Sequence, residues 1–215
     1  MPGPREEFDE ALEAIEAKVI ELFAMIVEDL PRAARCLPGS SQETARVLAE
    51  RERVADALCP EIERLAGLQI LLRAPVASDL RFLLSVLRVA PELERSHDLI
   101  MQIAAHAGLA ADLTPRASAI TAQMGDLACR MWQQAADSWY QRDPAAAAAL
   151  SRLDQEMDGL HASLTAELAA ERTTASAAMQ ATLVARCYDR LAAHALNIAR
   201  RTAYLARPPA NGPPR

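Results

Sequence analysis

The sequence predicts an all-α protein built as a helical bundle. Glycine (7 residues) and aromatic residues (4%) are scarce, while alanine and leucine, which rank high in helix propensity, dominate the chain. Apolar residues recur at spacings of three and four along almost the whole sequence, and the alternation typical of a strand is nearly absent. We therefore expect helices and no sheet.

Helix breakers divide the first half of the chain into three helices. A first helix over about 6–35 ends at LPGSSQ (37–42), where proline and glycine interrupt the apolar period. RAPVAS (73–78) separates a second helix from a third, since proline is favoured in the first turn of a helix. The widest break, GLAADLTPR (108–116), follows the third helix.

The same layout returns in the second half, so two tandem three-helix bundles are predicted, with six antiparallel helices in all. Their expected bounds are residues 1–109 and 110–206, and the tail at 207–215 is too rich in proline and glycine to pack and is expected to be disordered. The last three helices should end near Tyr140, Glu171 and Ala206, with turns at QRDP (141–144) and RTTAS (172–176).

Composition and charge exclude several classes of protein. A net charge of -6 argues against a general nucleic-acid binder, which needs a basic face to displace counterions from phosphates. The start of the sequence lacks the basic and apolar runs of a signal peptide, and no apolar stretch approaches the ~20 residues of a membrane helix. The scattered cysteines form no metal or redox motif, which favours buried thiols in a reducing, cytoplasmic setting: Cys36, Cys59, Cys129 and Cys187.

Acidic residues recur four positions apart on three of the predicted helices. Residues at this spacing stand on adjacent turns of one helix face, where two like charges repel by about 0.2–0.5 kcal/mol. A bound cation would reverse that cost. The pairs are Glu52 and Asp56, Glu94 and Asp98, and Asp154 and Asp158, and Asp189 opens a fourth spacing that ends at Ala193.

Each predicted hairpin brings two of these sets opposite each other, because residues equidistant from a turn stand side by side in antiparallel helices. The first two pairs have their midpoint at Pro75, within a predicted turn. The third pair and the Asp189 spacing have theirs between Thr173 and Thr174, within another turn. The pairs of the first hairpin also lie on the same side of their apolar stripes, so they should meet in an outer groove between the second and third helices.

Carboxylates that share a groove predict a metal site, because they cannot all stay ionised cheaply without a cation. Oxygen ligands suit hard cations such as Mg²⁺, Ca²⁺, Mn²⁺ or iron. The alternative is that these acids merely form solvated helix faces. The predicted ligands of a divalent or trivalent metal (iron, Mn, Mg or Zn) are Glu52, Asp56, Glu94, Asp98, Asp154, Asp158 and Asp189.

Two segments, together with the acidic spacings, give the chain a family likeness. LLRAPVASDLRFLLSVLRVAPELERSHDL (71–99) and VARCYDRLAAHALNIARRTAYLA (184–206) resemble the PhoU family of phosphate-transport regulatory proteins, and the likeness extends over nearly all of residues 6–206. The resemblance implies two three-helix bundles, each with a multinuclear metal site built from acidic residues. It also implies a cytoplasmic, often dimeric regulator that is not an enzyme, acting on a phosphate ABC transporter and its partner sensor histidine kinase. Association with the membrane would then be peripheral, through the partner.

The chain departs from the family pattern in both halves. In the third helix, where the family usually has isoleucine and glycine before the second acid, this chain has Ser96 and His97. We expect His97, on the apolar side of its helix, to be a packed histidine, with a metal ligand as the alternative. Ala193 stands where the second site needs a carboxylate, and His194 beside it could compensate or serve in the surface or core.

Two other functions stay open at this point. Glu94 and His97 have the Glu-x-x-His spacing of di-iron carboxylate enzymes, and Asp158 and His161 have a near version of it. Such enzymes need ligands that point into one bundle, whereas these carboxylates are predicted to face outward. An accessory protein of a low-affinity phosphate permease would share the helical layout.

Overall fold

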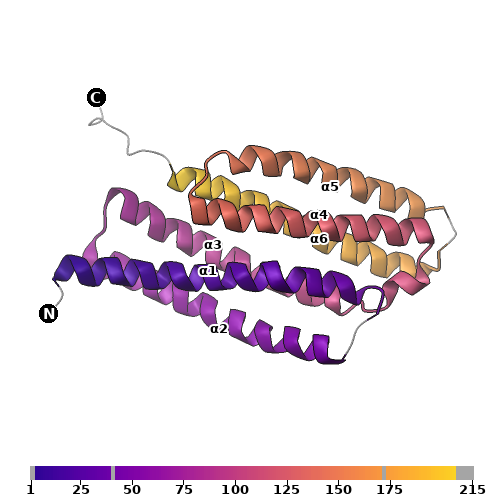
Figure 1. Ribbon diagram of the computed structural model, residues 1–215, viewed down its shortest axis with the longest axis horizontal. Helices are drawn as coiled ribbons and strands as arrows, with labels where there is room; N and C mark the ends of the chain where they lie inside the picture. Colours follow the sequence, from indigo (N-terminus) through magenta and orange to yellow (C-terminus); the bar gives the residue numbers. More distant parts are fainter. Residues whose placement is uncertain (1–2, 40–41, 171–172, 207–215) are drawn as a thin grey trace.

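The computed structural model describes residues 3–39, 42–170 and 173–206, and within these ranges every regular element is a helix. This confirms the predicted all-α fold (Figure 1). The expected tail at 207–215 and the predicted helix end at Glu171 lie outside the described residues. The elements are α1 (Pro4–Cys36), α2 (Gln42–Arg73), α3 (Ala77–Ala104), the short 3₁₀ helix η1 (Leu109–Asp112), α4 (Pro115–Gln141), α5 (Ala146–Leu168) and α6 (Ala175–Leu205).

Four helices form the centre of the molecule, and the other two flank them. α1, α3, α6 and α4 pack in a closed circuit, each against the next, while α2 lies on α1 and α3, and α5 lies on α4 and α6 (Figure 1). The two sets of three helices share one continuous apolar core. Its largest buried side chains include Trp132 and Trp139 of α4, which meet Phe23 of α1 with ring centroids 6.5 and 5.9 Å apart.

The turns fall where the breakers predicted them. α2 and α3 are joined by residues 74–76, so Pro75 is the centre of this connection. Thr114 and Thr174 cap the N-termini of α4 and α6, since their hydroxyl groups accept hydrogen bonds from backbone N–H groups three residues on, at 3.1 and 3.3 Å. Capping satisfies helix donors that have no partner in the first turn, and it fixes where α4 and α6 begin.

The buried stripe of α2 differs from the one that the sequence suggested. Val54 lies one helical turn before Leu58, a spacing that predicts a shared apolar face, but its side chain is 44% exposed. Ala55, Cys59 and Ala66 are buried instead, beside Leu58 and Ile62. The buried face of α2 therefore combines small residues with Leu58 and Ile62, and Val54 lies outside it.

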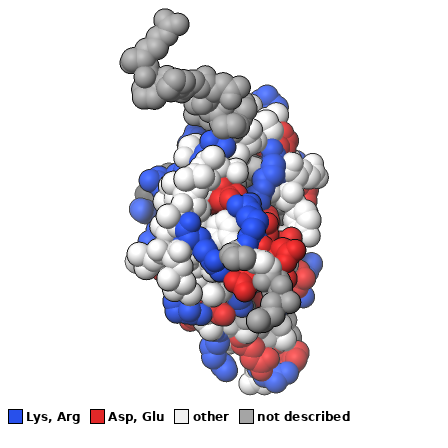
Figure 2. Space-filling view, turned by 90° about the vertical axis from the view of Figure 1, so that its left-hand side faces the viewer, with Lys and Arg blue, Asp and Glu red and all other residues white. Residues whose placement is uncertain are grey.

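One end of the molecule gathers the start of α1, the α2–α3 and α4–α5 turns and the end of α6 (Figure 1). Acidic and basic side chains lie next to one another around a shallow hollow on this end (Figure 2). Ion pairs tie the elements together here: Arg5 to Asp79 at 3.2 Å, Arg73 to Glu7 at 3.0 Å, and Arg142 to Glu16. None of the helices in the described ranges combines the length and apolar character needed to cross a membrane.

Candidate functional site

The first acidic cluster lies along the groove between α2 and α3. Glu52 and Glu94 are half-buried, whereas Asp56 and Asp98 are exposed, as expected of side chains at the edge of a helix pair. Within the described residues, none of these four carboxylates has an ion-pair partner, and Glu94 accepts a hydrogen bond from the thiol of Cys59. A cluster without cationic partners has the donor chemistry that suits a hard metal ion.

A thiol that the sequence interpretation left out borders the same groove. The pKa of Cys59 on α2 is raised to about 12, first by burial and then by the charges of Glu94 and Glu63. Cys59 and Glu94 are therefore neighbours across the groove, which confirms that the hairpin brings this part of α2 against the acidic part of α3. At neutral pH this thiol is protonated when no metal is bound.

The second cluster lies between α5 and α6. The pKa of Asp189 is raised by burial and by the charges of Asp158 and Asp154, although a hydrogen bond from His161 opposes the rise. The pKa of Asp154 is raised by burial and by the charge of Asp158, although the charge of Arg200 opposes the rise. Mutual repulsion of this kind shows that these three acids lie close enough to interact.

His161 on α5 also belongs to this cluster, although the sequence offered it only through its di-iron-like spacing with Asp158. Its Nδ1 atom pairs with Oδ2 of Asp189, while Oδ1 of Asp189 is buried and has no hydrogen-bond partner within the described chain. A buried carboxylate oxygen with a free lone pair, next to an imidazole and two further acids, fits a metal ion by its donor set. The Asp158-x-x-His161 spacing, which places both side chains on one helix face, was the available signal.

The alternative role considered for His194 is not realised, because this histidine lies in the contact between α6 and α3. Its Nδ1 atom is 2.8 Å from the hydroxyl of Ser96, which in turn donates to the carbonyl of Glu92. The pKa of His194 is lowered to about 4 by burial and by the nearby charges of Arg190 and Arg95. His194 is therefore neutral at pH 7 and joins two helices instead of replacing the carboxylate missing at Ala193.

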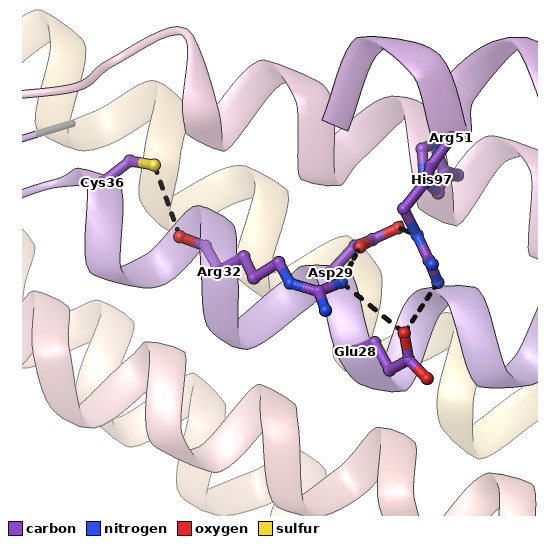
Figure 3. A network of polar contacts seen from close by, with 6 residues as sticks. All are labelled: Glu28, Asp29, Arg32, Cys36, Arg51 and His97. Atoms are coloured by element: carbon purple, nitrogen blue, oxygen red, sulfur yellow. Dashed lines mark hydrogen bonds and ion pairs between the residues drawn. The ribbon is translucent and has the colours of Figure 1, made fainter. Parts of the chain in front are cut away.

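The prediction of a packed histidine at His97 is confirmed. The ring is 2% exposed, and its Nε2 atom lies 3.2 Å from Oδ2 of Asp29, which is fully buried on α1. Arg51 of α2 donates to the same oxygen at 2.6 Å, and Arg32 of α1 donates to Oδ1 at 2.7 Å (Figure 3). Burial raises the pKa of Asp29, but the hydrogen bonds from His97, Arg51 and Arg32 outweigh it and hold this pKa below its usual value.

This network overturns the spacing argument for a di-iron enzyme in the first bundle. His97 points to Asp29 inside the bundle, whereas Glu94 borders the α2–α3 groove, so the two do not share a site. The sequence interpretation also missed Asp29. The signal was its position on the apolar face of α1, one turn from Met25 and Ile26 and one turn from Ala33, all of which are buried.

The two acidic clusters are not closed metal cages as they stand. Across the described parts of the chain, no group of three or more His, Cys, Asp or Glu side chains is arranged tightly enough to hold a metal ion. The grooves therefore supply ligands of suitable chemistry, while the distances between those ligands would have to shorten around an ion. Metal binding by the seven predicted acids stays a prediction.

Comparisons with known proteins agree with the resemblance found in the sequence. A family model described as PhoU domain matches residues 19–107 and again residues 121–202. The chain is similar to the phosphate-specific transport system accessory protein PhoU homolog of Zymomonas mobilis, with 29% identity over 89% of this chain and 83% of the relative. It is 32% identical to the homolog of the same name from Caulobacter vibrioides, over 71% of this chain and 69% of the relative.

A solved structure shares the fold. The crystal structure of PhoU from Pseudomonas aeruginosa superposes with a TM-score of 0.84 and 22% identity, covering 92% of this chain and 98% of that one. At this level of identity the likeness concerns the arrangement of the helices. It shows that the six-helix architecture is a fold that a solved protein adopts.

Proposed function

Because this chain belongs to the PhoU family, we propose that it is an accessory protein that regulates phosphate uptake and the response to phosphate starvation. The observation that carries the proposal is the family match in both halves of the chain, together with relatives that are named as transport-system accessory proteins. We infer that it acts by binding a phosphate ABC transporter and its partner sensor histidine kinase, and that it catalyses no reaction itself.

We further propose that it works in the cytoplasm as a homodimer that meets the membrane through its partners. Four free cysteines, three of them buried, fit a reducing compartment. Exposed apolar side chains at the α2–α3 turn, among them Leu71 and Val76 at 82% and 74% exposure, are available for protein contacts. Light scattering on the purified protein tests the dimer, and a monomer at micromolar concentration would contradict it.

The two grooves are proposed to hold divalent or trivalent metal ions, with iron, Mn, Mg and Zn as candidates. In the α2–α3 groove the ligands would be Glu52, Asp56, Glu94 and Asp98. In the α5–α6 groove they would be Asp154, Asp158 and Asp189, with His161 added from the structure. A bound cation would supply the positive charge that offsets repulsion between the acids, and imidazole would shift the second site towards zinc or iron.

Regulation of uptake can be tested by deleting the gene in the native host and measuring the rate of radiolabelled phosphate uptake in phosphate-rich medium. We expect uptake and a starvation reporter to rise in the deletion strain and to fall when the wild-type gene is restored. Loss of both effects in a strain that also lacks the ABC transporter would identify the partner. Unchanged uptake would contradict the proposal, and dependence on a low-affinity permease would favour that alternative.

Metal binding can be tested by elemental analysis of the purified full-length protein. The E94A/D98A and H161A/D189A double variants should each lose the metal of one groove. A control double variant at two exposed acids outside the grooves, Glu21 and Asp112, should keep the wild-type content. Equal metal content in all four proteins would rule out both sites, and a loss confined to one double variant would leave only that groove as a site.

A further inference from the structure

A cleft on the molecule lies outside both acidic clusters. It has a volume of about 430 Å³ and lies between α3 and α6, which pack antiparallel behind α1 and α4 in Figure 1. At about 30 Å³ for each water in the liquid, the cleft has room for a small polyatomic ion together with its water. The polar and aromatic side chains that line it are Arg88, Glu92, Asn197, Arg200, Arg201 and Tyr204.

Three arginines line this cleft, and in the described part of the chain none of them forms a hydrogen bond or an ion pair. Arg88 and Arg200 are exposed, and Arg201 is half-buried with its guanidinium group 5.0 Å from the ring centroid of Tyr204. The pKa of Arg201 is lowered first by burial and then by the charge of Arg88, against the opposing effects of Tyr204 and Glu92, so Arg88 and Arg201 are close enough to repel each other. Arg200 is near enough to Asp154 to lower the pKa of that carboxyl group. On a chain with a net charge of -6, three cations without a direct ion pair around one cleft point to an anionic ligand.

Guanidinium groups are suited to a tetrahedral oxyanion. Each offers several N–H donors in a planar fork, so two or three arginines around one ion can donate to several of its oxygens at once. Stacking on Tyr204 limits the orientations available to Arg201 before a ligand arrives. The cleft therefore offers several guanidinium N–H donors to one ion, and those of Arg201 are partly held in place before the ion binds.

Glu92 gives the cleft a second chemical feature. Its Oε1 atom accepts a hydrogen bond from Nδ2 of Asn197 at 3.0 Å, which holds a carboxylate at the wall of an otherwise basic cleft. A carboxylate repels a fully ionised oxyanion but accepts a short, strong hydrogen bond from one that carries an O–H group. Inorganic phosphate carries such a group at neutral pH, whereas sulfate and a doubly ionised phosphate monoester do not.

We propose that the cleft between α3 and α6 binds inorganic phosphate, with Arg88, Arg200 and Arg201 donating to its oxygens and Glu92 accepting its O–H. The inference rests on the unpaired arginines and on the placed carboxylate, and it does not depend on the proposed regulatory function or on metal binding. It assigns to this chain a direct site for the free ion, apart from any contact with a transporter.

Isothermal titration of the full-length protein with sodium phosphate, and separately with sodium sulfate, at constant ionic strength tests the proposal. The wild type should bind phosphate at least about tenfold more tightly than sulfate, because sulfate has no O–H group to donate to the Glu92 carboxylate. R88Q and R201Q should each weaken phosphate binding by about tenfold or more. R64Q, at an exposed arginine of α2 outside the cleft, is the matched control and should bind phosphate as the wild type does.

The E92Q variant separates a specific site from a merely basic surface. With the carboxylate removed, sulfate should bind about as tightly as phosphate, while circular dichroism should show an unchanged helical fold. Equal binding of both anions by the wild type, or loss of binding in R64Q as well as in R88Q, would overturn the proposal. Phosphate binding that is lost in D189N but kept in R88Q and R201Q would place the ion on a groove metal and would overturn it too.

Discussion

Replacing Asp29 by asparagine should destabilise the protein more than any surface change of the same kind. The wild-type carboxylate is fully buried and accepts hydrogen bonds from Arg51 at 2.6 Å and Arg32 at 2.7 Å, with His97 at 3.2 Å. The network joins α1, α2 and α3 (Figure 3). The amide keeps the shape of the side chain but loses the negative charge that holds these donors together.

The magnitude follows from the burial of each partner. Breaking a buried ion pair by removing one member typically costs about 3–5 kcal/mol. Here the two arginine side chains are 35% and 27% exposed, so water can solvate part of the charge that Asp29 leaves behind. We therefore expect a loss near the lower end, about 3 kcal/mol, which corresponds to roughly 6–12 °C in Tm for a chain of this size.

Urea denaturation followed by circular dichroism measures the effect, with D9N as a control on the same helix. Asp9 pairs with Arg5 on the surface at 3.0 Å, and an exposed pair of this kind adds little to stability because water screens it. The folded-state pKa of Asp29 is below its usual value of 3.8, so the carboxylate stabilises the fold above that pH and the gain is lost as pH falls through the folded pKa. If D29N loses no more stability than D9N at pH 7, the network does not hold the first bundle together.

Three further measurements test other parts of the structure. The pKa of His194 is lowered from 6.5 to about 4 in the folded state, so the unfolded state takes up a proton first and the wild type loses stability as pH falls from 6.5 towards 4. Between pH 7 and pH 5, the free energy of unfolding of H194Q should therefore fall by about 1–2 kcal/mol less than that of the wild type. Denaturation curves with the same pH dependence for both proteins would refute this. A Cβ atom at Gly125 would lie 3.0 Å from the Tyr188 hydroxyl, which has no hydrogen-bond partner in the described chain. In thermal unfolding, the G125A substitution should therefore destabilise the wild type by about 1 kcal/mol more than it destabilises Y188F. Equal losses in the two backgrounds would contradict the contact. Burial raises the pKa of Cys59 to about 12 and that of Cys129 to about 11, so neither should react with a thiol reagent within minutes at pH 8 in the native state, although both should do so in denaturant.

Much of the fold could be predicted from the sequence because it depends on local signals. The apolar period set the six helices, and the breakers around Pro75 and Thr174 set the turns of the two hairpins. Once a turn is fixed, antiparallel geometry determines which residues stand opposite, and the proximity of Cys59 to Glu94 agrees with that register. The family likeness was visible for the same reason, since it lies in short contiguous segments of helix and turn.

What the tertiary structure decided was the partner of each polar side chain. Spacing alone could not tell that His97 would meet Asp29 across 68 residues, that His161 and not His194 would join Asp189, or that α3 and α6 would bring three unpaired arginines to one cleft. These contacts depend on the rotation of each helix and on which of its faces meets a distant helix. Rotation is set by the sum of many small packing contacts, such as those of Ala55 and Ala66 on α2, and no local pattern in the sequence records that sum.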